Sequence, residues 1–125
     1  MRRGGGSPYD FYQDESSHPE YSTIVNQLKE FIPNHRANFG ILDCCDNAGH
    51  EFGFSPSVPE YVEALRQSDE YARELIDEAR NSCTNPDENL LVVLTTDHGG
   101  INYDHGGFSD EETTTWYALS QSLFN

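Results

Sequence analysis

Residues 90–107, LLVVLTTDHGGINYDHGG, begin with an apolar run that polar and glycine-rich sequence follows directly. A short apolar run of this kind predicts a buried strand of a parallel sheet over residues 90–94. Ligands of open α/β sheets bind beyond the carboxyl ends of strands. At that position the chain carries Asp97, His98, Asp104 and His105. Carboxylate and neutral imidazole are ligands for zinc, manganese or iron, so the stretch favours a metal site over an ordinary polar loop.

A second stretch, residues 38–53, repeats the pattern with the sequence NFGILDCCDNAGHEFG. Its apolar run predicts another short strand over residues 38–43, and the residues that follow include Asp46 and His50. These two lie four positions apart with Gly49 between them, so one tight turn can direct both side chains at a single ion. Two strands that end in ligand-type residues indicate a metal centre more specifically than one does.

Between the two predicted strands, residues 58–81 have the apolar spacing of an amphipathic helix. Ser57 and Glu60 form a capping-box pattern at its start. The order strand, helix, strand over residues 39–94 predicts a right-handed βαβ unit with parallel strands and a crossover helix. A shorter helix is expected over residues 21–32, and a third strand over residues 113–119.

Composition limits the classes of partner. The 125 residues suffice for one domain, and 22 acidic against 7 basic residues give a formal charge of −15. Such a surface disfavours nucleic acid and anionic membranes and favours divalent cations. Three cysteines, of which Cys44 and Cys45 are adjacent, argue against a disulfide framework. The sequence shows neither a signal peptide nor a transmembrane run, and the compartment stays open.

The motifs D-x-x-G-H-x-x-G (Asp46 to Gly53) and T-x-D-H-G-G…H-G (Thr95 to Gly106) resemble the alkaline phosphatase superfamily. The likeness is greatest to its type I phosphodiesterase/nucleotide pyrophosphatase branch, and it covers roughly residues 20–118. It implies an α/β, partial alkaline-phosphatase-like three-layer fold and two divalent metal ions, usually zinc, with manganese possible. By motif, one ion would be held by Asp46, His50 and His105, and the other by Asp97 and His98.

The chain also departs from that pattern. The superfamily places a further Asp and a Thr or Ser nucleophile after an earlier strand, and no such segment precedes residue 38 in this sequence. Residues 1–20 are therefore expected to be a flexible arm. Residues 21–125 are expected to be a partial domain that needs the missing N-terminal half or a partner chain. The resemblance implies hydrolysis of a small-molecule phosphoric or sulfuric ester. The alternative is a truncated or degenerate domain that binds metal or a partner without catalysis.

Overall fold

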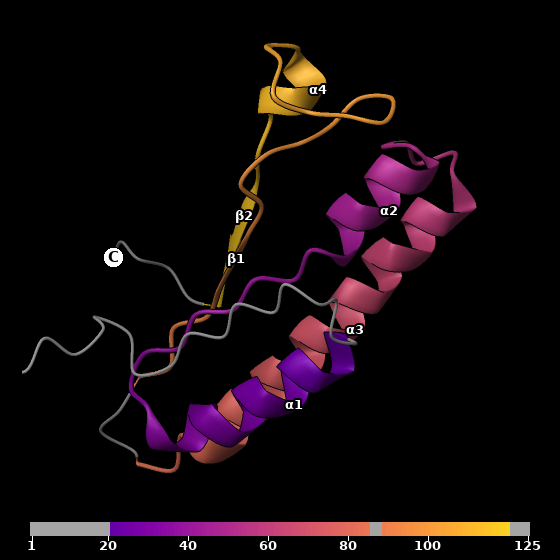
Figure 1. Ribbon diagram of the computed structural model, residues 1–125. Coiled ribbons are helices and arrows are strands. Elements are labelled where there is room, and N and C mark those ends of the chain that lie inside the picture. The colour runs from indigo at the N-terminus through magenta and orange to yellow at the C-terminus, as the bar shows by residue number, and fades with distance from the viewer. Residues whose placement is uncertain (1–20, 86–88, 121–125) are drawn as a thin grey trace, which may run out of the picture.

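The computed structural model describes residues 21–85 and 89–120, and the expected flexible arm over residues 1–20 lies outside them. Four α-helices, one 3₁₀ turn and two short strands follow one another in these ranges (Figure 1). In chain order they are α1 (Tyr21–Phe31), η1 (Ile32–Asn34), α2 (Cys44–Phe52), α3 (Pro59–Ser82), β1 (Val93–Thr95), α4 (Asp110–Thr113) and β2 (Tyr117–Leu119). The fold is thus a mixture of helices and a small sheet, consistent with the α/β class.

Helix α3 is the long central element, and both α1 and α2 pack against it (Figure 1). The predicted helices over residues 21–32 and 58–81 are confirmed as α1 and α3. Val25 of α1 and Cys44 of α2 are the buried apolar side chains of the described residues, with 1% and 7% exposure. An ion pair of 3.0 Å between Lys29 and Glu74 also joins α1 to α3. The buried core is therefore small and lies between helices.

The predicted capping box at the start of α3 is wrong. The N-cap is Val58 rather than Ser57, and no side chain caps the helix. Pro59 accounts for the shift, because proline suits the first helical position and disfavours helical geometry in the residue before it. Val58 accordingly has extended φ and ψ angles of −93° and 112°. Ser57 is left one residue too early to cap.

The sheet differs from the expected one. Strands β1 and β2 pair antiparallel, with Val93 opposite Leu119 and Thr95 opposite Tyr117. The expected strand over residues 38–43 is not formed, because these residues find no strand partner in the part of the chain that is described. The third strand begins later than expected because helix α4 occupies residues 110–113. The parallel pair, its crossover helix and the three-layer arrangement stay predictions.

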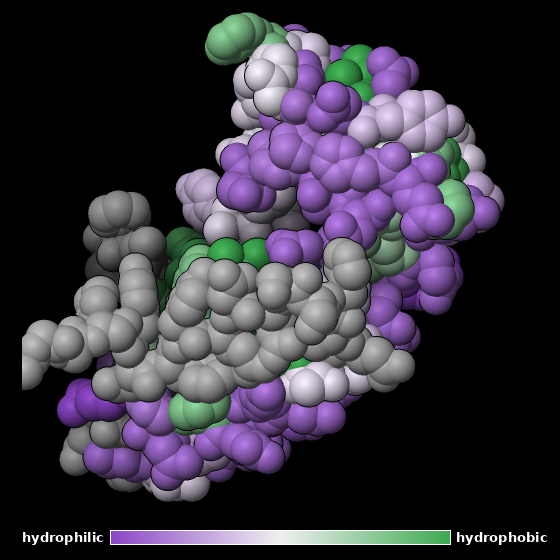
Figure 2. Space-filling model, viewed as in Figure 1, coloured by the Kyte–Doolittle hydropathy of each residue, from purple (hydrophilic) through white to green (hydrophobic). Residues whose placement is uncertain are grey.

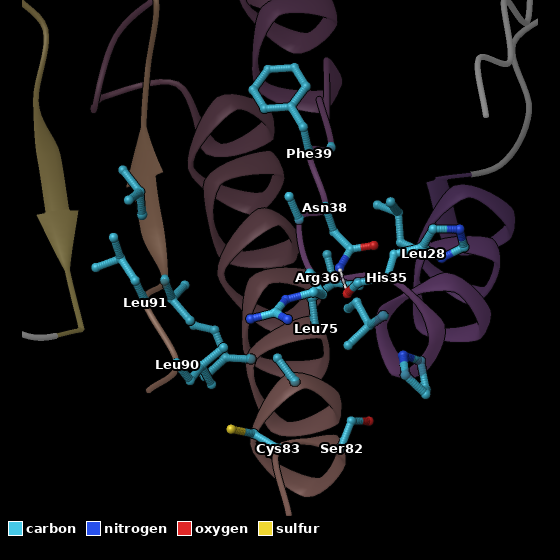
Figure 3. Close-up of a pocket in the computed structure, with 18 of the residues that line it drawn as sticks. Leu28, His35, Arg36, Asn38, Phe39, Leu75, Ser82, Cys83, Leu90 and Leu91 are labelled. Carbon is cyan, nitrogen blue, oxygen red and sulfur yellow. Dashed lines mark hydrogen bonds between the residues drawn. The ribbon is translucent and has the colours of Figure 1, made fainter. Parts of the chain in front are cut away.

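An open groove lies where the parallel pair was expected (Figure 3). It has a volume of about 820 Å³, and its walls are residues 34–40 with Leu42 on one side and residues 89–94 on the other. Leu75 and Ile76 of α3 are among the apolar residues that line it. Figure 2 shows a mostly hydrophilic surface that a hydrophobic patch interrupts near its centre. Of the helices between residues 21 and 120, none has the length and apolar character that crossing a bilayer requires.

Candidate metal centre

Helix α2 places Asp46 and His50 on one face. The helix begins beyond Asp43, whose carbonyl accepts a bond of 2.9 Å from the backbone N–H of Asn47. It ends at Gly53, whose φ of 114° suits glycine. Residues four apart lie one turn above each other, and Asp46 Oδ2 is 3.5 Å from His50 Nε2. The two side chains converge as the sequence suggested, on a helix rather than in a tight turn.

The loops after β1 bring two more imidazoles to the same carboxylate. Asp46 Oδ1 lies 3.3 Å from His105 Nε2 and 4.0 Å from His98 Nε2. The rings of His98 and His105 are stacked, with centroids 3.8 Å apart and planes at 24°. Ligand atoms of Asp46, His98 and His105 all lie within 4.8 Å of one another. These three half-buried side chains can therefore share one ion.

Backbone carbonyls fix the orientation of two of the imidazoles. His50 Nδ1 lies 2.9 Å from the carbonyl oxygen of Tyr103, and His98 Nδ1 lies 2.8 Å from that of Gly99. A carbonyl oxygen only accepts, so each Nδ1 carries the proton and donates it. In the neutral ring Nε2 then keeps its lone pair, which is the form that binds a metal.

The carboxylate of Asp46 supports the same conclusion. Its Oδ1 is buried and accepts no hydrogen bond from any of the described residues, which are 21–85 and 89–120. A buried carboxylate oxygen without a partner is costly. Asp46 Oδ1 faces the Nε2 atoms of His105 and His98, and the tautomer of His98 leaves a lone pair on its Nε2. A cation between them would satisfy all of these atoms at once. The donor set of one carboxylate and two or three imidazoles fits a zinc-type ion.

The other ligand-type residues lie around these three. The Asp97 side chain is 90% exposed, and its Oδ1 is 3.8 Å from His98 Nε2. Asp104 is exposed and accepts a bond of 2.8 Å from the backbone N–H of His105. The ring centroid of His50 lies 4.9 Å from that of His105. Three of the five predicted ligands thus converge most closely, with His50 beside them and Asp97 at the rim.

Phe54 is a neighbour of the centre that sequence patterns did not indicate. Its ring meets His50 edge-on at 5.4 Å and His105 at 6.1 Å between centroids. A Cβ atom on Gly49 would come within 2.2 Å of this ring, and one on Gly100 within 2.5 Å. The ring therefore fills the space between α2 and the segment after His98. In the sequence, Gly49 and Gly100 were the available sign that a bulky side chain packs at this point.

The adjacent cysteines face α3 rather than the imidazoles. Their Sγ atoms lie 2.8 Å and 3.1 Å from Ser68 Oγ, for Cys44 and Cys45 respectively. A hydrogen bond from Cys45 lowers the pKa of Cys44 to about 6, and the same contact raises the pKa of Cys45. Cys44 is buried, with 7% exposure. None of the three cysteines, all of which lie within residues 21–85, forms a disulfide.

Comparison with known proteins gives one match. The sequence model of the family described as type I phosphodiesterase/nucleotide pyrophosphatase matches residues 22–116. The matched region contains all five predicted ligands and every helix from α2 to α4. No curated protein and no solved structure was found to match the chain.

Proposed function

The chain belongs to the type I phosphodiesterase/nucleotide pyrophosphatase family, and from this premise we propose that it is the metal-binding part of a phosphoester hydrolase. The observation that carries the proposal is the environment of Asp46 Oδ1. This buried oxygen has no hydrogen-bond partner among the described residues and faces the Nε2 atoms of His98 and His105. A divalent cation is the simplest group that suits all three.

The proposed ligand sets follow the motifs. Asp46, His50 and His105 hold one ion, and Asp97 and His98 contribute to a second. Zinc is favoured because the donors are imidazoles and carboxylates, and manganese is the alternative. Such ions, when bound, would stabilise charge on the ester oxygens and lower the pKa of a bound hydroxyl group. Asp46 Oδ2 faces His50, and its Oδ1 faces both His105 of the same set and His98 of the other, so this carboxylate lies next to both proposed sets.

The chain's own residues would prepare this site before any substrate arrives. The carbonyls of Tyr103 and Gly99 hold two imidazoles as the Nδ1-protonated tautomer, so each Nε2 is ready to bind. The substrate we propose is a small phosphoric ester, with a sulfuric ester as the variant. A formal charge of −15 opposes binding of a long polyanion, because every added phosphate increases the repulsion.

The groove supports a further part of the proposal. Residues 38–42 and 90–92 are extended, and Phe39 and Leu91 are 82% and 43% exposed. Extended segments on both sides of an apolar groove offer backbone groups to another strand. We propose that parallel strands form here, with α3 as the crossover helix, once polypeptide beyond this chain fills the groove. That polypeptide, an N-terminal half or a partner chain, would also supply the nucleophile.

The second candidate function is a non-catalytic domain that binds metal or a partner. Two observations favour it. The ligand motifs lie together in the structure, and no Thr or Ser of the described residues is assigned as a nucleophile. The two candidates agree on metal binding and differ on turnover. Activity measurements therefore separate them only when metal binding is measured on the same sample.

The test is zinc binding by titration calorimetry, with hydrolysis of nitrophenyl phosphate, bis-nitrophenyl phosphate and nitrophenyl sulfate measured in parallel. The chain alone should bind zinc and turn over these esters barely above background. Asp46→Asn should weaken zinc binding by more than the roughly 10–100-fold loss typical of groups that only orient ligands, because a carboxylate ligand is itself removed. Asp69→Asn is the matched control, since that exposed carboxylate pairs with Arg73 on α3. Absence of zinc binding in the wild-type chain would refute the proposed function.

A further inference from the structure

Glu112, on the short helix α4, contacts both histidine-bearing loops. Its backbone carbonyl accepts a bond of 2.8 Å from the N–H of Gly99, the residue after His98. Its carboxylate Oε1 accepts a bond of 2.8 Å from the N–H of Gly107, two residues after His105. Oε2 accepts from the N–H of Ser109 at 3.2 Å. One residue thus connects the segments that carry the stacked imidazoles.

Helix α4 is itself fixed in place. The side chain of Ser109 accepts from the backbone N–H of Glu112, so the two residues form a reciprocal capping box. The chain then runs back along β1, with Thr95 opposite Tyr117. The backbone N–H of Thr96 also donates to the carbonyl of Trp116. The position of Glu112 is therefore set by the sheet as well as by the cap.

The glycines of the two loops supply an independent observation. A Cβ atom on Gly99 would lie 1.9 Å from the backbone oxygen of Glu111. A Cβ atom on Gly107 would lie 2.5 Å from the carboxylate of Glu112. Both distances are far below van der Waals contact. At Gly99 the obstacle is backbone, so only glycine permits this approach, whereas at Gly107 the Glu112 carboxylate would have to move. The hydrogen bonds and the glycines report the same tight contact.

We infer that Glu112 is a positioning residue that sets the separation of His98 and His105. It touches neither ring, and it acts by holding the backbone of the two loops at a fixed distance. The part of the inference that concerns zinc affinity rests on the proposed function. The part that concerns the separation of the two imidazoles rests on the stacked rings alone. Groups that orient ligands from behind commonly change metal affinity by about 10–100-fold when they are replaced.

The experiment compares the wild-type chain with Glu112→Gln and Glu111→Gln. Glutamine at 112 keeps the size but has one carbonyl oxygen, so its amide group faces one of the two N–H donors. Glu111 is exposed, and its replacement makes the same charge change on the same helix. Two quantities are measured. One is the NMR cross-relaxation between the ring protons of His98 and His105 without metal, and the other is zinc affinity.

The wild-type chain and Glu111→Gln should show the ring cross-peaks and equal zinc affinity. Glu112→Gln should lose the cross-peaks and bind zinc about 10–100-fold more weakly. Unchanged cross-peaks and affinity in folded Glu112→Gln would overturn the inference. A variant with a lower melting temperature but normal cross-peaks and affinity would also overturn it, because that result indicates a structural role only.

A second variant covers the case in which Glu112→Gln does not fold. Gly107→Ala keeps the Glu112 charge and crowds the same contact, so it should also lose the cross-peaks and weaken zinc binding. Retention of both by folded Gly107→Ala would then count against the inference. If the wild-type chain binds no zinc, the proposed function fails, whereas the ring cross-peaks still decide the role of Glu112.

Discussion

The metal-centre end of the molecule and the groove end are built from equally short segments, yet they differ in how their backbones are satisfied. At the centre, the backbone carbonyls of residues 99 and 103 accept from imidazoles, and Glu112 accepts from both loops. At the groove, residues 38–42 lie extended without a strand partner among the described residues, and Phe39 is 82% exposed. The difference teaches that the site is fixed by local bonds, whereas a strand over residues 38–42 needs a hydrogen-bonding partner that the described residues do not provide.

The largest effect is expected from filling the space at the centre. Gly49→Ala would place a Cβ atom within 2.2 Å of the Phe54 ring. Overpacking of this kind costs about 1–3 kcal/mol. In an open helix position the same change would instead stabilise by roughly 0.5–1 kcal/mol. Urea unfolding therefore tests the packing around Gly49 by the sign of the change in the free energy of unfolding. A more stable Gly49→Ala variant would contradict the tight packing.

A smaller effect is expected at the cap of α4. Ser109→Ala removes the side chain that accepts from the backbone N–H of Glu112, and should cost about 1 kcal/mol of stability. Ser57→Ala is the matched control, because Ser57 occupies the same S-x-x-E pattern before α3 and does not cap it. Its cost should stay within about 0.5 kcal/mol. Equal losses of stability in thermal unfolding would contradict the assignment of Ser109, and not Ser57, as a helix cap.

The acid dependence of stability sharpens the comparison further. Hydrogen bonds from the N–H groups of Gly107 and Ser109 hold the pKa of Glu112 below its usual value. A lowered folded-state pKa gives stability above the unfolded value of about 4.3, and this is lost as the pH falls through the folded value. The stability gap between the wild-type chain and Glu112→Gln should thus be constant near neutral pH and close in acid. A stability difference that grows in acid would contradict the hydrogen bonds from Gly107 and Ser109 to the Glu112 carboxylate.

The smallest effect is expected at the groove. Phe39→Ser removes a side chain that is 82% exposed, so the free energy of unfolding should change by less than about 0.5 kcal/mol. Val25→Ala is the contrasting variant, because that side chain is 1% exposed and should cost more. Guanidinium titrations of both would check the order. A large loss in Phe39→Ser would show that the groove end is already packed.

Sequence periodicity predicted α1 and α3 well because helical hydrogen bonds are internal to each segment, but it missed the shorter helices α2 and α4. The apolar spacing in residues 21–32 and 58–81 corresponds to α1 and α3, whose ends differ by a residue or so. The strand over residues 38–43 failed for the opposite reason, since a strand needs a partner to bond. Residues 90–92 likewise lie outside a strand, although Val93–Thr95 form β1 through pairing with β2.

The candidate site was predictable in its ligand types and not in its supports. The spacing of Asp46 and His50 indicated a shared face, and the residues after β1 indicated imidazoles nearby. The rings of His98 and His105 stack on each other, and ligand atoms of both lie near Asp46. The division of these two histidines between two ions therefore stays a prediction. Glu112 was missed because its role depends on bonds to loops that precede it in the chain. The signal was an S-x-x-E pattern directly after the H-G-G sequence.

The bond between His50 Nδ1 and the carbonyl of Tyr103 has a consequence for how this site tolerates mutation. The orienting atom belongs to the main chain, and the Tyr103 side chain is 62% exposed. Many residue types at position 103 would therefore leave the imidazole correctly turned, and a random library there should be largely permissive. Deleting one residue between His98 and His105 would instead move that carbonyl away. An atom important to the site thus lies at a position whose side chain is free to vary.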